Sequence, residues 1–332
     1  MSGATKIEWT DATWNPVTGC TKISPGCKNC YAERIFHRPY PDRAFTDVRT
    51  HHERLDWPLR WKGSPQAKRE GRPSKIFVVS MGDPFHEFVP RGYIDQIFTR
   101  MACRDGFIFQ LLTKRTPNIC FYLTDGRGMY ARRRIQDQLE LTGKPHTAAT
   151  LIDRWPLSNV WIGFSAENQE TFDQRWADVE LLAKSGWTTW ASLEPLLGPI
   201  VLPKHFLNLA KWVVAGGESG PNARPSHPDW FRSVRDQCQA AGVPFFFKQW
   251  GKWKDGSDVG KRLCVYNDGR SCEFTQEAIR AEEKLSGIPH IECNPVVITS
   301  VGKKRAGRLL DGREWNEFPE TGSANAKPKN EG

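Results

Sequence analysis

The sequence lacks a long uninterrupted apolar run, and its first residues lack the order of basic, apolar and small residues that marks a signal peptide. A helix that spans a membrane needs about 20 mostly apolar residues, so we expect no membrane segment and a cytoplasmic location. The hydrophobic fraction of 39% and the charged fraction of 26% are typical of a soluble globular protein. A chain of 332 residues is long enough to bury a sizeable core without disulfides.

A fourth cysteine is missing from the stretch VTGCTKISPGCKNCYAER, residues 17–34, which holds three of the nine cysteines. In a reducing compartment such a cluster more often binds metal or performs redox chemistry than forms disulfides. Cys20, Cys27 and Cys30 have the spacing C-x6-C-x2-C, which matches no common structural zinc pattern. The six scattered cysteines are expected to be ordinary buried or half-buried thiols: Cys103, Cys120, Cys238, Cys264, Cys272 and Cys293.

Two kinds of metal site remain open for the three clustered thiols. A zinc ion would need a fourth ligand, for which His37, His51 or His52 is available in the sequence. An iron-sulfur cluster held by three thiolates would instead leave one iron free to bind something other than protein. The number of clustered thiols therefore matters. Three thiolates leave a zinc ion one ligand short, whereas they leave an iron-sulfur cluster with one iron that can bind a cofactor or substrate.

The formal net charge of +9 favours a polyanionic partner or substrate. Basic residues concentrate in residues 60–75, 130–135 and 301–308, and 14 tryptophans are spread along the chain. Aromatic side chains interleaved with Lys and Arg suit a surface that stacks bases and neutralises phosphates. The same composition also fits tryptophans in the core and basic stretches in solvated loops.

Short apolar or β-branched runs recur along the chain, each followed by a polar cluster and then by a longer amphipathic stretch. Runs without clean alternation, separated by segments of helix length, are typical of parallel strands with helices on the outside. The expected fold class is α/β, a partial or complete (β/α) TIM-like barrel with a small C-terminal appendage. An open doubly wound sheet has the same local rhythm and differs in strand order. The expected strands lie in residues 13–19, 75–85, 107–118, 159–168, 188–200, 211–221 and 243–251.

The strand and helix rhythm also suggests the domain organisation. Residues 1–253 are expected to form the barrel, with insertions at 38–74 and 121–158, the second of which should carry an extra basic helix. Residues 254–319 should form a small appendage of short strands and one helix. The polar stretch 320–332 is typical of a disordered tail.

In a parallel barrel the working residues cluster in the loops after the carboxyl ends of the strands. This chain places polar or ionisable side chains after each of its seven expected strands. So many at the strand ends favour a functional site at the carboxyl end of the barrel over a chance distribution of polar residues. Lys114 and Arg115 offer two cations for a carboxylate or phosphate, or else for a salt bridge within the protein. The side chains after the strands are Cys20, Cys27, Cys30, Asp83, His86, Lys114, Arg115, Ser165, Glu167, Asn168, Ser192, Glu194, Glu218, Ser219, Lys248 and Gln249.

A three-cysteine loop after the first strand of a barrel resembles the radical S-adenosylmethionine (SAM) superfamily. More closely, the chain resembles a phage and prophage family known for its three-Cys motif. The similar stretches cover nearly the whole chain and are WNPVTGCTKISPGCKNCYAER, DWPLRW, LLTKR, NVWIGFSAEN, SLEPLLGPI, VVAGGESGPNARP, FFFKQWG and LLDGREWNEFP.

The resemblance implies a cofactor site and a chemistry. Cys20, Cys27 and Cys30 would hold a 4Fe-4S cluster whose open iron chelates SAM, and one electron would cleave SAM to a 5'-deoxyadenosyl radical. The implied cofactor-binding residues are Gly82, Asp83 and Pro84, at the turn beside the methionine amino group, and Ser165, Glu167 and Asn168, beside the ribose. The residues expected to complete the catalytic side are Lys114, Arg115, Glu194 and Glu218.

The first functional hypothesis is a radical SAM-like enzyme that modifies or repairs a nucleic-acid base or a nucleotide-derived substrate. It implies an electron donor such as flavodoxin or ferredoxin, no membrane, and a possible partner protein encoded nearby. The second is a cluster-free barrel hydrolase or lyase that uses Asp83, Glu194 and Glu218, with the cysteines in a structural zinc site. The third is a non-enzymatic, nucleic-acid-binding protein that carries a cluster.

Overall fold

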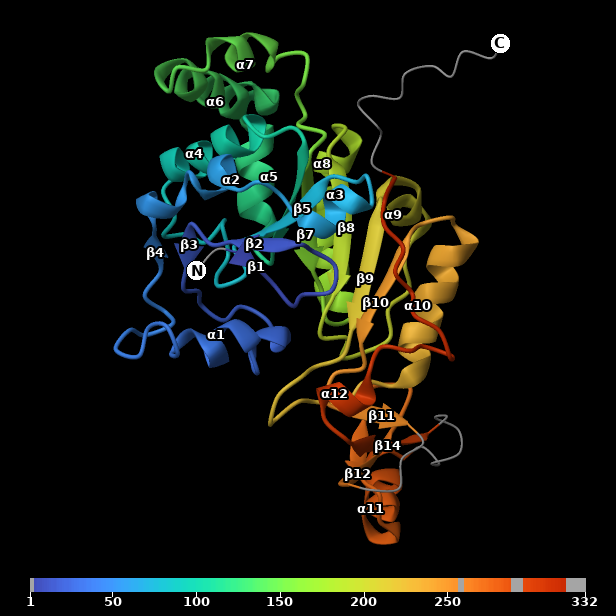
Figure 1. Cartoon of the computed structure of the whole chain (residues 1–332). Helices are drawn as coiled ribbons and strands as arrows, with labels where there is room; N and C mark the ends of the chain where they lie inside the picture. The colour runs from blue at the N-terminus through green and yellow to red at the C-terminus, as the bar shows by residue number, and fades with distance from the viewer. Residues whose placement is uncertain (1–2, 256–259, 288–294, 321–332) are drawn as a thin grey trace.

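The computed structural model describes residues 3–255, 260–287 and 295–320. In this part of the chain eight strands form one curled sheet at the centre of the molecule (Figure 1). Every strand is parallel to its neighbours except β1, which pairs antiparallel with β2. In spatial order the strands are β1 (Gly3–Ala4), β2 (Ala12–Trp14), β5 (Ser74–Val78), β6 (Phe107–Thr113), β7 (Val160–Ser165), β8 (Thr188–Leu193), β9 (Trp212–Gly216) and β10 (Phe245–Gln249).

The strand order confirms the partial barrel and excludes the doubly wound alternative. From β1 to β10 the order in the sheet follows the order in the chain, whereas a doubly wound sheet reverses direction at a switch point. The two edge strands, β1 and β10, end the series, so within the described residues the barrel is open on one side. The carboxyl ends of the strands lie toward the bottom of Figure 1, on the side of α1 (Tyr31–Phe36).

Helices cover the outer face of the sheet, as the rhythm of the sequence predicts. The predicted extra basic helix is α6, in the second insertion. Two short strands, β3 (Val17–Thr18) and β4 (Arg49–Thr50), pair beside the cysteine loop. The other helices of the barrel region are α2 (Trp57–Arg60), α3 (Pro65–Arg69), α4 (Arg91–Ala102), α5 (Thr116–Thr124), α6 (Met129–Leu141), α7 (Pro145–Thr150), α8 (Gln169–Lys184), α9 (Lys204–Leu209) and α10 (Pro228–Ala240).

Aromatic rings fill the interior of the barrel at the amino-terminal ends of the strands. Trp190 and Trp212 point inward from β8 and β9, and their ring centroids are 5.0 Å apart. Trp9, from the loop between β1 and β2, packs edge-on against Trp190 at 5.5 Å. Gly163 on β7 makes room for this cluster, because a Cβ there would lie 2.3 Å from the Trp190 ring. The barrel interior is therefore packed at the amino-terminal ends of the strands and opens at their carboxyl ends.

The C-terminal segment covers the free edge of β10. Asn316 forms a β-bridge with Phe246, and the Trp212 indole donates a hydrogen bond of 2.8 Å to the Glu317 carbonyl oxygen. Phe318 stacks against Trp212 with a centroid separation of 5.2 Å. A chain edge that would otherwise expose unpaired backbone groups is thus paired and buried.

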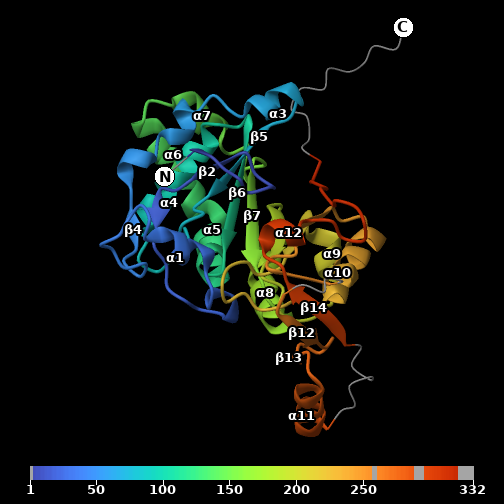
Figure 2. The ribbon, with the colours of Figure 1, turned by 60° about the horizontal axis from the view of Figure 1, so that its bottom comes forward.

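A small antiparallel sheet follows the barrel strands and lies beyond them at the bottom of Figure 1 and Figure 2. The predicted helix of this region is α11 (Gln276–Ser286), which Thr275 caps through its side chain and Gly287 ends in a left-handed conformation. Residues 321–332 of the predicted tail 320–332 lie outside the described residues, as does Cys293. The elements are β11 (Trp253–Asp255), β14 (Val296–Ser300), β12 (Arg262–Val265) and β13 (Ser271–Glu273) in sheet order, and α12 (Lys303–Ala306).

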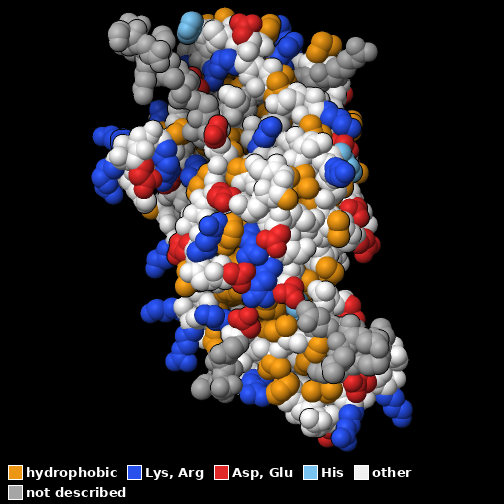
Figure 3. Space-filling view, turned by 90° about the vertical axis from the view of Figure 1, so that its right-hand side faces the viewer, with side chains coloured by type: hydrophobic (Ala, Val, Ile, Leu, Met, Phe, Trp, Pro, Cys, Tyr) orange, Lys and Arg blue, Asp and Glu red, His pale blue; other side chains and the backbone are white. Residues whose placement is uncertain are grey.

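The tryptophans are core residues, and the basic stretches are spread over the molecule. All 14 tryptophans are buried or half-buried, so none forms an exposed stacking platform. Residues 60–75 and 130–135 lie around α3 and α6, away from the carboxyl ends of the strands (Figure 1). On the face over α9 and α10, side chains of both signs are interspersed (Figure 3). There Arg232 pairs with Asp229 and with Asp311.

We predict that Gly163→Ala destabilises the fold by about 1–3 kcal/mol, because the added Cβ must push the buried Trp190 ring out of place. Gly92→Ala is the matched control, since no atom lies within 4 Å of its Cβ position in α4, and it should be neutral or slightly stabilising. Urea unfolding measures both. Equal stability of the two variants would contradict the packing described for the barrel interior.

Candidate functional site

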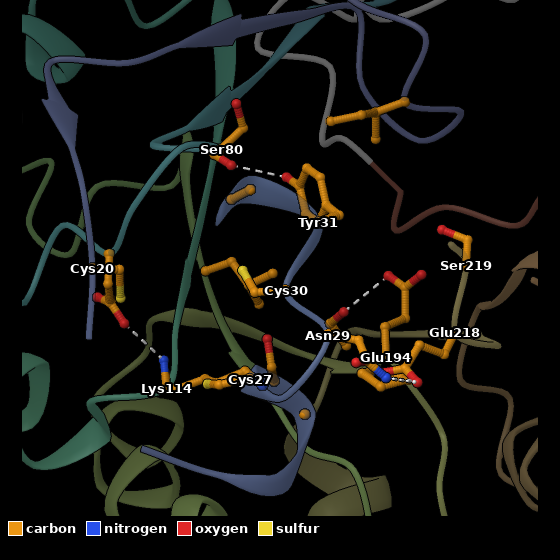
Figure 4. A pocket seen from close by; sticks show the side chains of 18 of the residues that line it. Cys20, Cys27, Asn29, Cys30, Tyr31, Ser80, Lys114, Glu194, Glu218 and Ser219 are labelled. Carbon is orange, nitrogen blue, oxygen red and sulfur yellow. Dashed lines mark hydrogen bonds between the residues drawn. The ribbon is translucent and has the colours of Figure 1, made fainter. Parts of the chain in front are cut away.

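A cavity of about 410 Å³ opens at the carboxyl ends of the strands (Figure 4). It brings together the three clustered cysteines and most of the strand-end side chains that the sequence singles out. Because parallel strands end at one edge, residues far apart in sequence meet there. The predicted site residues that line it are Cys20, Cys27, Cys30, Gly82, Asp83, Lys114, Arg115, Ser165, Glu194 and Glu218.

The cysteine loop runs from β3 to α1 across one wall of the cavity. Cys27 ends a short 3-10 helix, Pro25–Cys27, and Cys30 is the residue that precedes α1. The Cys20 amide donates to the Phe45 carbonyl oxygen at 2.8 Å. Cys20 and Cys30 pack against an apolar cluster that includes Phe36, so this wall is poor in water-binding groups.

The three thiols differ in their electrostatic surroundings. Burial, with Asp83 nearby, raises the pKa of Cys20 to about 12, and burial also raises the pKa of Cys30. Burial alone would raise the pKa of Cys27 too, but the Lys114 ammonium and nearby hydrogen-bond donors outweigh it and hold that pKa below its usual value. A metal centre bound by all three must therefore displace protons from at least two of them.

Glu167 anchors one end of the cysteine loop to the barrel. This fully buried carboxylate pairs with Lys114 and, at 3.1 Å, with Arg175, and it accepts a hydrogen bond of 2.9 Å from the Ser24 hydroxyl. Burial acts to raise the pKa of Glu167, yet the two cations hold it below its usual range. A Cβ at Gly26 would lie 2.2 Å from the Glu167 carboxylate, so only glycine allows the loop to pass this close.

Glu218 anchors the other end of the loop. It accepts hydrogen bonds from the Asn29 side chain at 2.9 Å and from the Arg224 guanidinium at 2.6 Å (Figure 4 shows the Asn29 contact). Asn29 also donates to the Asn222 carbonyl oxygen at 2.7 Å. Burial opposes ionisation of Glu218, but Arg224 and Asn29 keep its pKa low. Asn29, one of the two residues between the last two cysteines, is thus tied to the loop after β9.

Asp83 and Arg115 fix the turn after β5 against β6. The Asp83 carboxylate accepts from the Thr113 hydroxyl at 2.8 Å and from the Lys114 amide at 3.1 Å. Arg115 lies 3.4 Å from Asp83 and donates to the Cys20 sulfur at 3.4 Å. Arg115 therefore places a cation beside the thiol whose ionisation is hardest.

Glu194 and Lys248 face the cavity from β8 and β10. The carboxylate and the ammonium are 3.0 Å apart, and the Ser192 hydroxyl donates to Glu194 at 3.0 Å. Their side chains are 14% and 18% exposed, so both reach the cavity. Gly216, on the strand between them, leaves the space that they need, because a Cβ there would be 2.7 Å from the Glu194 carboxylate.

Three predicted cofactor residues do not line the cavity. Glu167 is engaged beneath the cysteine loop, and Asn168 caps α8 in a capping box with Thr171. Pro84 lies in the turn next to Asp83 but contributes no wall. Four further residues line the cavity without having been predicted as cofactor or catalytic residues: Trp9, Asn29, Lys248 and Lys303. The sequence identifies Lys248 only as a side chain at the end of a strand. The other three reach the cavity because distant segments of the chain pack together, which the sequence pattern does not show.

The histidines proposed as fourth zinc ligands are not grouped with the thiols. His51 hydrogen-bonds the Thr18 hydroxyl at 2.8 Å, and in the described chain no three Cys, His, Asp or Glu side chains converge on a point that suits a single metal ion. Each carboxylate of the hydrolase hypothesis is held in an ion pair: Asp83 with Arg115, Glu194 with Lys248 and Glu218 with Arg224. Among the described residues no helix combines the length and apolarity that a membrane crossing requires.

Comparisons with known proteins give a family and distant structural likenesses. The family model described as "Protein of unknown function (DUF5131)" matches residues 4–319. No curated protein matches the chain. Spore photoproduct lyase complexed with dinucleoside spore photoproduct is 11% identical with a TM-score of 0.40, over 86% of this chain and 74% of the lyase. A double mutant of the lyase with bound AdoMet and the same photoproduct is 13% identical with a TM-score of 0.39, over 88% and 76%.

We predict that Glu167→Gln lowers the free energy of unfolding by about 3 kcal/mol at pH 7, because it leaves the buried Arg175 and the half-buried Lys114 without their carboxylate. The folded pKa of Glu167 lies below its ordinary value of 4.5. The carboxylate therefore stabilises the fold above that value, and this contribution disappears as the pH falls through the folded pKa.

Denaturant unfolding at a series of pH values checks this prediction. The difference between wild type and Glu167→Gln should be largest above about pH 5 and should shrink toward pH 3. Glu170→Gln, on the exposed surface of α8, is the control and should change little at any pH. A difference that does not depend on pH would show that Glu167 is not held as a carboxylate.

Proposed function

We propose that this chain, which belongs to the DUF5131 family, is an enzyme that uses a 4Fe-4S cluster and SAM to act on a nucleotide-type substrate. The observation that carries the proposal is the meeting of three thiols, from one short loop, on a single wall of a cavity whose other walls are strand-end polar groups. The positive net charge supports the choice of an anionic substrate.

The residues present fit a cluster better than a single ion. Soft thiolate ligands suit iron-sulfur clusters, and each cysteine of such a cluster binds a different iron, so the sulfurs need not converge on one point. Cys20, Cys27 and Cys30 would hold it. Three protein ligands leave one iron for another ligand, and the described residues group no fourth Cys or His with them.

Positive charge near the loop reduces the free energy needed to keep three sulfurs anionic. The Lys114 ammonium acts on Cys27, and the Arg115 guanidinium contacts Cys20. Both cations are held in place by carboxylates, Lys114 by Glu167 and Arg115 by Asp83. We assign these four residues to binding and positioning of the thiolates, and none of them to proton transfer.

The turn after β5 and the end of β7 are the proposed SAM side of the cavity. Gly82 forms a parallel bridge with Gly19, and a Cβ at position 82 would lie 2.6 Å from the Gly19 carbonyl oxygen. At this turn the cavity is therefore lined by the backbone of Gly82, next to Asp83. Ser165 offers a hydroxyl from the end of β7.

When bound, the cluster and SAM supply one-electron chemistry that removes a hydrogen atom from an otherwise unreactive carbon. The chain's own contribution is to orient the reactants and to exclude water. Trp9, Phe77 and Leu112 line the cavity and give it apolar walls. A dry site protects a reactive species from side reactions with solvent.

We expect anaerobic reconstitution with iron and sulfide to give a brown protein with a 4Fe-4S absorption spectrum. Cys20→Ala, Cys27→Ala and Cys30→Ala should each lose most of the bound iron, whereas Cys103→Ala, outside the site, should bind iron as the wild type does. With SAM and a strong reductant, the wild type should release 5'-deoxyadenosine and the three site variants should not.

Iron, sulfide and zinc analysis and chromatography of the reaction products make these measurements. A colourless protein with one zinc after reconstitution would refute the cluster. A cluster that forms normally but never yields 5'-deoxyadenosine would leave iron binding in place and refute the SAM-dependent activity.

A further inference from the structure

The cavity wall formed by Glu194 and Lys248 differs from the walls around Asp83 and Glu218, because much of its hydrogen-bonding capacity is unused. Asp83 accepts from two backbone amides, a hydroxyl and a guanidinium, and Glu218 accepts from Asn29 and from three Arg224 nitrogens. Within the described chain Glu194 has only two partners, Ser192 and Lys248, and Lys248 has only Glu194.

A count of hydrogen-bonding positions shows what this wall can still bind. An ionised carboxylate offers about four acceptor positions and an ammonium three donors. Glu194 accepts one hydrogen bond, from Ser192, and forms an ion pair with Lys248, so about two acceptor positions and two donors remain. Both side chains are partly exposed to the cavity, so a ligand can reach them.

The pairing of opposite charges restricts the chemistry of the ligand. A phosphate or carboxylate placed here would be repelled by Glu194, and an isolated cation would be repelled by Lys248. A neutral group that carries a donor and an acceptor side by side satisfies both. The amide or amidine edge of a nucleobase has this pattern, and carboxylate, amide and ammonium side chains are common partners of base edges.

The surroundings provide the other contacts that a nucleotide needs. Trp9 and Phe77, both buried and with ring centroids 4.8 Å apart, line the same cavity and form an apolar floor beneath the space that a flat heterocycle would occupy. Lys6 and Lys303 also line it, and Lys303 is 49% exposed, with Glu8 at 3.4 Å. Glu8 offsets part of the Lys303 charge, but no carboxylate among the described residues pairs with Lys6, so the two lysines together can meet a phosphate outside the apolar part of the cavity.

A buried acceptor next to Lys248 adds to this pattern. Gln249 lines the cavity and is 7% exposed, and its side-chain oxygen has no hydrogen-bond partner among the described residues. Buried polar atoms are nearly always paired in folded proteins. An unpaired acceptor in a residue of this wall is consistent with a polar ligand that completes it.

We propose that Glu194 and Lys248 read the base edge of a nucleotide whose phosphate is met by Lys6 and Lys303. The choice of a nucleotide rests on the proposed function, but the donor and acceptor pattern does not depend on the cluster. Free nucleotides and nucleotides within a single strand share this chemistry, and separate probes distinguish them.

The test measures how much a base adds to binding by the full-length protein, both cluster-free and reconstituted. One arm compares deoxynucleoside 5'-monophosphates with 2-deoxyribose 5-phosphate. The other compares a labelled 12-nucleotide single strand containing all four bases with an abasic strand of the same length. In the wild type the base should tighten binding in at least one arm by about tenfold or more.

Lys248→Met and Glu194→Gln should remove most of this base-dependent gain. Lys303→Met should weaken base-containing and abasic probes alike, so that their ratio stays as in the wild type. Lys211→Met, an exposed lysine before the start of β9, is the matched control and should change nothing. Thermal unfolding of each variant shows whether it is folded, and two independent site variants guard against loss through misfolding.

The inference is overturned if the wild type gains nothing from a base in either arm, or if both folded site variants keep the wild-type ratio. These results are separable from failure of the cluster. A protein that binds no iron but shows the predicted ratio would keep the base-reading pair and lose the radical chemistry. A reconstituted protein that cleaves SAM but shows no base-dependent binding would keep the radical chemistry and refute the base-reading pair.

Discussion

The buried Glu167 carboxylate is the interaction on which the site depends most. A buried charge is tolerated only when it is paired, and Glu167 is paired with Lys114 and Arg175 while it also receives the Ser24 hydroxyl. One carboxylate thereby connects the ends of two strands to the cysteine loop. Gly26 must lack a side chain for the loop to approach, so the loop sequence and the barrel constrain each other.

The loop is anchored on the opposite side as well, through Asn29 and Glu218 after β9. A third tie comes from Tyr31, whose hydroxyl donates to the Ser80 carbonyl oxygen at 2.9 Å after β5 (Figure 4). A loop of glycine, proline and small residues would otherwise sample many conformations, and each tie removes part of that freedom before any cofactor binds. Preorganised ligands on rigid supports are what a cofactor site requires.

Much of this arrangement is predictable from the sequence, for a physical reason. Parallel strands share one carboxyl edge, so Asp83, Glu194 and Glu218 could be expected near the cysteines once the strands were recognised. The sequence could not show which strand-end side chains open into the cavity, and Glu167 lies beneath the loop instead of facing a ligand. Trp9 was equally hidden, since its place in the barrel depends on packing against Trp190.

The same packing explains why tryptophan-rich composition was ambiguous. Rings that could have formed a stacking surface fill the barrel interior at the amino-terminal ends of the strands. Glu194 and Lys248, at the carboxyl ends, are the pair that we propose to select the substrate. The central claim is that three thiols hold a cluster with one iron left for SAM. Electron paramagnetic resonance of the reduced, reconstituted protein tests it most directly. The account predicts a 4Fe-4S signal whose shape changes when SAM is added, and a signal that SAM leaves unchanged would contradict it.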